Sequence, residues 1–226
     1  MFKPKFDWIT FDCYGTLIDW ERGIADAFTS QARRDGRTVD RSSVLDVYHR
    51  TEPQVEADSY RRYRDVLAST AARVGESLGW TLPSDRAGFL AESLPSWPPF
   101  PDTNPSLSRL AASGVRLGIL SNVDDELLEK TRRHFDVEFS LIVTAEQVRS
   151  YKPAHGHFTT AGTRLPPGAR WLHAAQSYFH DVVPCKELRI PVAWINRKRE
   201  RAGSAGAPDQ EFKDLTGLAD WVLLKV

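Results

Sequence analysis

The sequence predicts an α/β fold: a parallel sheet with a helical domain inserted close to its start. Two observations lead to this fold class. Short apolar runs alternate with amphipathic helical patterns through the second half of the chain, and about a hundred residues separate the first apolar run from the second. Strands that alternate with helices pair in parallel and carry helices on both faces of the sheet, and the long gap leaves room for a second domain.

Short apolar runs rich in β-branched or aromatic residues predict buried strands. They are residues 8–11, 115–120, 141–143, 171–174 and 192–195. Helical patterns lie between them, for example at 124–134 and 155–163. We therefore expect a Rossmann-like core with a parallel sheet.

Polar-rich segments with apolar residues at intervals of three and four predict amphipathic helices in the gap. They are 21–35, 41–49, 58–75 and 85–92. Residues 94–105 hold five of the chain's 14 prolines and predict the return connection to the sheet, because proline disrupts a helix interior. These patterns place the core at 1–19 and 98–226 and a helical cap at 20–97. The polar, glycine- and alanine-rich segment 198–208 predicts a mobile loop.

Charge and cysteine content exclude several function classes. Lys+Arg and Asp+Glu are equal at 30 each, which gives no long-range field to attract nucleic acid or an anionic membrane. Cys13 and Cys185 are far apart and form neither a disulfide framework nor a metal-ligand spacing. The N-terminus lacks the apolar stretch of a signal peptide, and no run approaches the roughly 20 apolar residues of a membrane helix. We expect a cytoplasmic protein without nucleic-acid or membrane partners.

The clearest chemical signal is the stretch ITFDCYGTLIDW at residues 9–20. An apolar strand delivers Asp12, and Gly15 and Thr16 follow in a tight turn. Ligands of open parallel sheets bind at the carboxyl ends of strands, so Asp12 stands where chemistry is expected. Taken alone, Asp12 fits the capping of a turn equally well.

Polar side chains at the ends of later strands favour the chemical interpretation. Ser121 and Asn122 end the second strand and offer a hydroxyl and an amide that can bind an anion. Lys152 precedes a proline, which predicts extended or turn backbone before a helix, and Asp181 follows the fourth strand. Alone, Lys152 fits a solvated loop and Asp181 a helix N-cap. Together they bring a cation and a second acid to the sheet edge that holds Asp12.

The order Asp, Ser-Asn, Lys-Pro, Asp on successive strand ends resembles the four motifs of the haloacid dehalogenase superfamily. The resemblance covers nearly the whole chain, because the helical cap falls between the first and second motifs, where that family's first cap type is inserted. About 30 residues separate Asn122 from Lys152, which leaves no room for the family's alternative cap. The resemblance implies a hydrolase whose Asp12 is a covalent nucleophile.

Within that superfamily, two positions favour a dehalogenase over a phosphatase. As the resemblance implies, phosphatases carry an acid two residues after the nucleophile, which protonates the leaving alkoxide, and two carboxylates in the fourth motif, which hold Mg²⁺. Here Tyr14 and Gln176 stand at the corresponding positions. A phenol with an ordinary pKa of roughly 10 is a poor general acid, and an amide is a weaker Mg²⁺ ligand than a carboxylate. The DxYGT motif and IPVAWINR at 190–197 resemble the 2-haloacid dehalogenases, which release halide without a proton and need no metal or other cofactor.

The chain departs from that group in two respects. The L-2-specific enzymes carry Ser-Ser-Asn just before the aspartate of the fourth motif, and the asparagine helps to hold the hydrolytic water. The corresponding positions here are Gln176, Ser177 and Tyr178. Those enzymes also supply a cap arginine to the halide and carboxylate, which has no firm counterpart here. The candidates are Arg50, Arg61 and Arg62, and we assign substrate binding to Arg50. Each of them also fits an exposed surface position.

The resemblance implies a role for each candidate residue. Asp12 would attack a carbon bearing halogen and form an aspartyl ester, while Thr16 orients its carboxylate. Lys152 would reduce the repulsion between the anionic nucleophile and an anionic substrate. Asp181 would act as the base, or position the water, that hydrolyses the ester. The substrate carboxylate would be bound at Cys13, Tyr14, Ser121, Asn122 and the cap residue Arg50.

Two other functions stay open. One is a Mg²⁺-dependent phosphatase of small phosphate esters, with the metal held by Asp12 and Asp181; sensitivity to EDTA separates it from a dehalogenase. The other is a binding or regulatory protein on the same scaffold, which the residues at Gln176 and Tyr178 motivate. The sequence predicts a small anionic substrate without identifying it, and it leaves the oligomeric state, including a homodimer, open.

Overall fold

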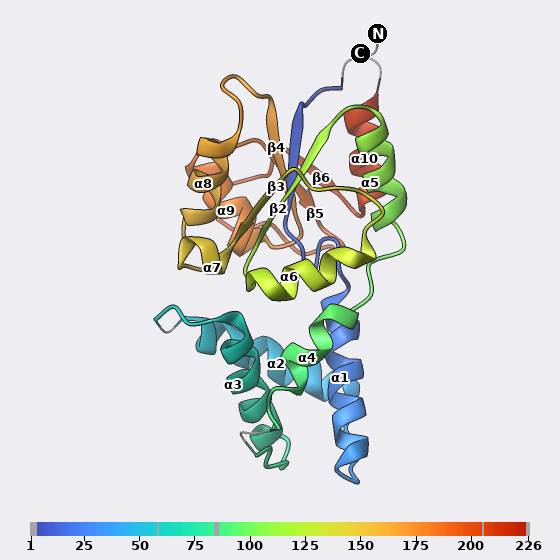
Figure 1. The fold of residues 1–226 in the computed structure, drawn as a ribbon, viewed down its shortest axis with the longest axis vertical. Coiled ribbons are helices and arrows are strands. Elements are labelled where there is room, and N and C mark those ends of the chain that lie inside the picture. The colour runs from blue at the N-terminus through green and yellow to red at the C-terminus, as the bar shows by residue number, and fades with distance from the viewer. Residues whose placement is uncertain (1–3, 58, 84–85, 205, 225–226) are drawn as a thin grey trace. The chain divides into compact units, whose positions relative to one another are not determined.

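The computed structural model describes residues 4–57, 59–83, 86–204 and 206–224 (Figure 1). The chain divides into two compact units. The first, here called the sheet unit, comprises Met1–Ile18, Pro99–Asn122 and His134–Val226. The second, the helical unit, comprises Asp19–Pro98 and Val123–Arg133. Segment 123–133, which the sequence analysis placed in the core, therefore groups with the helices.

The sheet is parallel throughout and, over the described residues, has six strands. The strands are β1 (Trp8–Phe11), β2 (Arg116–Ser121), β3 (Leu141–Thr144), β4 (Trp171–Ala175), β5 (Val192–Ile195) and β6 (Gln210–Phe212). Their order is β3-β2-β1-β4-β5-β6, which confirms the predicted α/β, Rossmann-like fold class. The sequence did not predict β6, because its three residues are all partly or fully exposed and form no apolar run.

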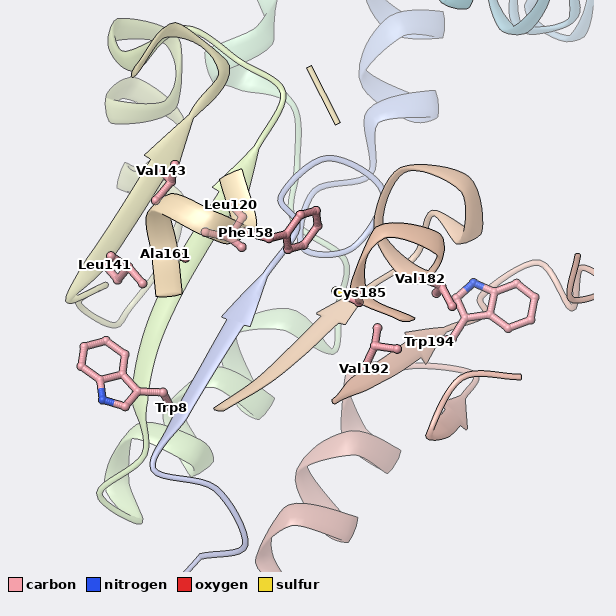
Figure 2. Packing of buried hydrophobic residues seen from close by; sticks show 10 residues of the cluster. All are labelled: Trp8, Leu120, Leu141, Val143, Phe158, Ala161, Val182, Cys185, Val192 and Trp194. Atoms are coloured by element: carbon pink, nitrogen blue, oxygen red, sulfur yellow. The ribbon is translucent and has the colours of Figure 1, made fainter. Parts of the chain in front are cut away.

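The first strand lies in the middle of the sheet and is buried along its whole length. Trp8 pairs with Arg116 on one side and with Trp171 on the other. Apolar side chains pack against this sheet in the cluster that Figure 2 shows. Its members are Trp8, Leu120, Leu141, Val143, Phe158, Ala161, Val182, Cys185, Val192 and Trp194. Burying a large apolar side chain stabilises a fold by roughly 1.5–3 kcal/mol, so this cluster holds the strand ends in fixed positions.

Helices cover both faces of the sheet (Figure 1). Those of the sheet unit are α5 (Thr103–Ala112), α7 (Ala145–Val148), α8 (Gly156–Arg164), the π-helical turn η3 (Tyr178–Val182), α9 (Val183–Glu187) and α10 (Leu215–Leu223). Helices α5 and α10 pack together on one face, while α8 and α9 lie on the other. The helix predicted at 155–163 agrees with α8 to within one residue.

The helical unit consists of short amphipathic helices. They are α1 (Trp20–Arg34), α2 (Arg41–Glu56), α3 (Tyr63–Ser77), α4 (Phe89–Ser93), η1 (Leu94–Ser96) and α6 (Asp125–Thr131), which η2 (Arg132–His134) follows. Asp19 and Asp40 cap α1 and α2 by accepting backbone N–H bonds. Helix α2 runs past its predicted end and contains Pro53. The predicted starts of the next two helices, Asp58 and Asp85, lie outside the described residues.

Asp124 explains why segment 123–133 belongs to the helical unit. Its buried carboxylate accepts hydrogen bonds from the backbone N–H groups of Tyr63 (2.7 Å) and Arg64 (3.0 Å), the first residues of α3. These N–H groups have no partner within their own helix, so a carboxylate from elsewhere in the chain caps α3. Within the same unit, Gly23 touches the indole of Trp97, and an added Cβ would overlap that ring.

The loop after β5 is anchored at several points. Asn196 donates to the carbonyl of Glu200 (2.9 Å) and accepts from its N–H (2.8 Å). The hydroxyl of Tyr178 lies 3.0 Å from the carbonyl of Gly203 and 2.7 Å from that of Gly206. Residue 205 of the predicted mobile segment 198–208 lies outside the described part, and the mobility stays a prediction. No helix within the described ranges is long and apolar enough to cross a membrane.

Candidate active site

The candidate residues of the sheet unit gather where neighbouring strands end. Asp12 directly follows β1, Ser121 ends β2, and Asp181 lies in η3, just after β4. Because β2, β1 and β4 are adjacent and parallel, their carboxyl ends meet at one edge of the sheet. Lys152 reaches the same edge from the loop before α8, and its bond to Pro153 is cis.

Lys152 joins the two aspartates. Its Nζ lies 2.9 Å from Oδ1 of Asp12 and 2.6 Å from Oδ1 of Asp181. The third N–H of the ammonium donates to the carbonyl of Leu120 at 2.9 Å. The ammonium is buried together with both carboxylates. A buried charge is stable only when it is paired and hydrogen-bonded, and here all three donors of Lys152 are engaged.

The two aspartates respond differently to this shared ammonium. Burial raises the pKa of Asp12 above its ordinary value; Lys152 opposes this shift, and the charge of Asp181 adds to it. Burial would also raise the pKa of Asp181, but the charge of Lys152 and a hydrogen bond from His173 outweigh it and lower that pKa. Burial would lower the pKa of Lys152, yet the two carboxylates raise it. Lys152 is therefore a permanent cation, and Asp181 stays ionised.

Thr16 orients the carboxylate of Asp12. Its hydroxyl donates to Oδ2 of Asp12 at 2.9 Å and accepts the backbone N–H of Gln176 at 2.9 Å. The amide can only donate, so the hydroxyl proton is directed at Asp12. Gly15, with φ of 102°, makes the turn that returns Thr16 to the strand end.

Arg197, in the loop after β5, braces this turn. Its guanidinium donates to the carbonyl of Thr16 at 2.8 Å and makes two hydrogen bonds, of 3.0 and 2.9 Å, to the carboxylate of Asp102. In the sequence, Arg197 was noted only as the last residue of the IPVAWINR stretch. Its contact with the turn that follows Asp12 joins distant parts of the chain, so no local pattern could predict it.

The two residues of the second motif do different things. The amide of Asn122 accepts from the backbone N–H of Lys152 (2.7 Å) and donates to its carbonyl (3.1 Å), which holds the lysine in place. The Oγ of Ser121 is buried and, within the described ranges, has no hydrogen-bond partner. This hydroxyl can donate one hydrogen bond. Substrate binding by either residue stays a prediction.

Cys13 and Tyr14 form the start of the turn after Asp12. The carbonyl of Cys13 accepts the N–H groups of Leu17 and Ile18, and Tyr14 makes a short bridge to Ile18. Burial raises the pKa of the Cys13 thiol well above its ordinary value, so it remains a neutral thiol. The binding role assigned to both residues is untested.

The arginine candidates all lie in the helical unit. Arg50 is an exposed residue of α2. The guanidinium of Arg61 donates to the carbonyl of Val55 at 3.0 Å, which ties it to the structure of its own unit. The structure thus brings together the candidates of the sheet unit, whereas the role of Arg50 stays a prediction.

Tyr178, at the position of the family's asparagine, is bound to other parts of the sheet unit. Its hydroxyl is bound to loop carbonyls at Gly203 and Gly206, and its ring packs against Trp194 at 5.4 Å between centroids. Asp181 is also not the N-cap that its position suggested, because Ser177 caps η3.

Two buried histidines escaped the sequence analysis. His173 of β4 lies with Nε2 3.0 Å from Oδ1 of Asp181 and with Nδ1 2.9 Å from the hydroxyl of Thr10. Nε2 of His157 lies 3.1 Å from the carbonyl of Ser121. Burial, with the charge of Lys152, lowers the pKa of His157 to about 3, so this ring is neutral. A histidine inside the apolar run 171–174 was the one available signal.

The residues at this edge fit a divalent metal poorly. Asp12 and Asp181 both bind the ammonium of Lys152, and Gln176, the third candidate, offers only a neutral amide. No group of three His, Cys, Asp or Glu side chains suited to a metal ion occurs in the described part of the chain.

The site thus holds a buried aspartate bound to a lysine at the edge of a Rossmann-like sheet, with a second acid beside it. A family model for haloacid dehalogenase-like hydrolases matches residues 6–173, and the chain belongs to this family. The chain is 28% identical, over 95% of its length and 97% of the relative's, to the (S)-2-haloacid dehalogenase H-109 of Pseudomonas putida.

Two solved structures show how widely this fold is shared. The L-2-haloacid dehalogenase from Xanthobacter autotrophicus with chloropropionic acid covalently bound superposes with a TM-score of 0.84 at 20% identity, covering 96% of this chain and 98% of that one. The putative HAD-hydrolase YfnB from Bacillus subtilis, bound to magnesium, gives 0.83 at 16% identity, covering 97% and 99%. The likeness to both shows the fold, and the choice of reaction rests on the site.

Proposed function

We propose that this protein is a 2-haloacid dehalogenase in which Asp12 displaces halide from a small 2-haloalkanoic acid. The observation that carries the proposal is an oriented carboxylate nucleophile, Asp12, followed two residues later by Tyr14 in place of an acid. An alkoxide leaving group requires a proton donor there, whereas a halide does not. The 28% identity to an (S)-2-haloacid dehalogenase over nearly the full chain supports the same reaction.

The first step is a displacement at carbon. An Asp12 oxygen attacks C2 of the substrate, the carbon–halogen bond breaks, the halide leaves with the bonding electrons, and an aspartyl ester forms. Thr16 holds the carboxylate in the attacking orientation. The unpartnered hydroxyl of Ser121 and the backbone after Asp12 bind the substrate carboxylate, and Lys152 offsets the repulsion between the two anions.

The second step hydrolyses the ester. Water adds to the carbonyl carbon of the Asp12 ester, and the bond from that carbon to the substrate oxygen breaks. A 2-hydroxy acid leaves, Asp12 is regenerated, and one proton is released to solvent. The developing negative charge lies beside the ammonium of Lys152, which stabilises it. Asp181, ionised and partly unpaired, accepts a hydrogen bond from the attacking water.

The test is a release assay with both enantiomers of 2-chloropropionate and a panel of small phosphate esters, each with and without EDTA. We expect chloride and lactate in equal amounts, unchanged by the chelator. Phosphate release that EDTA abolishes would establish the phosphatase instead. Release of neither halide nor phosphate, with Asp12 unmodified on mass spectrometry, would favour a binding protein.

A further inference from the structure

A line of hydrogen bonds runs beneath the candidate site and ends on Asp181. Nε1 of Trp171 lies 2.8 Å from the hydroxyl of Thr10, which lies 2.9 Å from Nδ1 of His173. Nε2 of His173 lies 3.0 Å from Oδ1 of Asp181. Thr10, His173 and Asp181 are buried, with exposures of 0%, 0% and 1%. Neither Thr10 nor His173 is used in the mechanism given above.

The donors and acceptors of these groups are compatible with one continuous direction along the line. The indole N–H of Trp171 can only donate, so the Thr10 oxygen accepts it. We assign the Thr10 proton to the bond with Nδ1 of His173. In this assignment Nε2 of His173 carries the ring's proton and donates to the carboxylate of Asp181. This direction satisfies each buried donor along the line.

The donors around Asp181 are unevenly divided between its two oxygens. Oδ1 receives both Lys152, at 2.6 Å, and His173, at 3.0 Å. Oδ2 is buried and has no hydrogen-bond partner among the side chains and backbone groups that the structure describes. Two donors on one oxygen, from different directions, fix the rotation of the carboxyl group. The second oxygen, Oδ2, therefore points in a fixed direction and can accept a hydrogen bond from a ligand.

We propose that His173 is a positioning residue for the second half-reaction: it holds Asp181 so that Oδ2 binds the water that hydrolyses the Asp12 ester. The inference rests on the proposed dehalogenase reaction. His173 does not itself take the water's proton, because the nitrogen that faces Asp181 already carries one. It thereby supplies part of the water-orienting function for which Tyr178, bound to the loop after β5, is unavailable.

The alternative is that His173 only fills space in the core, where its ring meets Phe158 edge-on at 5.2 Å. Two substitutions separate the roles. His173→Phe keeps an aromatic ring for packing but removes both nitrogens. His173→Gln loses the ring but keeps a side-chain N–H that can reach Asp181. If His173 only packs in the core, His173→Phe should be the milder change. If it positions Asp181, His173→Gln should be the milder change.

The kinetic test follows the pre-steady state of 2-chloropropionate turnover by rapid quench, with substrate in excess over enzyme. In His173→Phe we expect a normal burst of one chloride per site, then steady-state turnover slower by about 10- to 100-fold, as loss of a hydrogen bond to a charged group implies. The Asp12 peptide should carry the ester adduct on mass spectrometry, and KM should fall with kcat because the ester accumulates. His173→Gln should recover most of the rate.

Controls keep the outcome interpretable. His155→Gln changes a surface histidine that also pairs with a carboxylate, Glu187, and should leave the kinetics unchanged. If His173→Phe fails to fold, Thr10→Val supplies the same test, because it removes the hydroxyl that sets the tautomer. A burst and steady state equal to those of the wild type in whichever variant folds would overturn the role of His173. So would an equal slowing of both steps, which indicates general disruption.

A readout without substrate separates this inference from the proposed function. Nitrogen-15 NMR of the histidine-labelled wild-type protein should show His173 as the Nε2–H tautomer, assigned by its loss in His173→Gln. An Nδ1–H tautomer would overturn the hydrogen-bond direction whatever the reaction is. If the wild type releases no halide from any haloacid, the proposed function fails, and the His173 role fails with it. A wild type that turns over while His173→Phe builds up no ester contradicts His173 alone.

Discussion

The site holds two carboxyl groups in different environments: Asp12 at the end of β1 and Asp181 just after the end of β4. Asp12 and Asp181 both bind Nζ of Lys152 through Oδ1 and are both buried. Asp12 has Thr16 as its one further side-chain donor among the described residues, and burial raises its pKa. Asp181 lies closer to Lys152, also receives His173, and its pKa is lowered. In the proposed mechanism these identical carboxyl groups take two roles: Asp12 is the more basic nucleophile, and Asp181 is a weakly basic, fixed acceptor for water.

The largest effect should come from removing the nucleophile. Asp12→Asn has nearly the same shape but no anionic oxygen, so we expect turnover to fall by at least about 10⁴-fold, with no halide burst. The measurement is chloride release under single-turnover conditions. Asp220→Asn, an exposed aspartate paired with Arg109, is the control and should be silent. Halide release by Asp12→Asn at near the wild-type rate would remove Asp12 from the chemistry.

Removing the ammonium of Lys152, which Asp12 and Asp181 share, should destabilise the folded protein. Lys152→Met keeps much of the side chain's length but leaves two buried carboxylates without their cation, so we expect the free energy of unfolding to fall by roughly 3–5 kcal/mol. Urea denaturation measures this. Lys130→Met breaks an exposed pair with Glu126 and should change stability by less than about 1 kcal/mol. Equal losses in the two variants would show that the buried ion pairs of Lys152 stabilise the protein no more than the exposed pair of Lys130.

The pH profile tests the β1 end alone. Asp12 must be ionised to attack, and its pKa lies above the ordinary value, so activity should be lost on acidification at a pH above that of a free aspartate, whose pKa is about 3.9. The Thr16 hydroxyl favours the ionised form; Thr16→Val therefore raises this pKa further and moves the acid limb to higher pH, with kcat lower by about 10-fold.

The kcat–pH profile of Thr16→Val is compared with those of the wild type and Thr163→Val, which alters an exposed helical hydroxyl. An acid limb that stays in place, or moves to lower pH, would contradict the assignment of Thr16.

The smallest effect should come from the brace behind the nucleophile turn. Arg197→Lys keeps the charge but loses the paired hydrogen bonds to Asp102. We expect a decrease in kcat of less than about 10-fold and a loss of about 1–2 kcal/mol in stability. Arg109→Lys, at a single exposed contact with Asp220, is the matched comparison. A larger kcat loss than in Thr16→Val would mean that the turn depends more on Arg197 than on its own hydrogen bonds.

The sequence predicted what short-range patterns encode. The apolar runs located β1 to β5, since buried parallel strands need such runs, while the exposed strand β6 carried no such signal. Helix α2 continues through Pro53, where the pattern predicted an earlier end. The ion pairs of Lys152 span 140 and 29 residues, and the strand-end positions together with the family resemblance predicted that these residues meet.

The finer parts of the site depend on contacts that no local pattern contains. The bonds from the amide of Asn122 to the backbone of Lys152 were not predicted, and its expected binding of substrate stays a prediction. Tyr178 stands where the family has a water-holding asparagine, but its side chain is bound to the loop after β5. His173 could have been noticed as a polar residue in an apolar strand, but its partner Asp181 becomes apparent only when η3 folds back over β4.

The nucleophilic role of Asp12 is tested most directly by running several turnovers in oxygen-18 water and sequencing the Asp12 peptide by mass spectrometry. If Asp12 attacks carbon and water then opens the ester, the label enters the Asp12 carboxyl, and the first hydroxy acid released carries an unlabelled alcohol oxygen. Label that appears in the hydroxy acid from the first turnover, with an unlabelled Asp12, would mean that water attacks the substrate directly and would contradict this role.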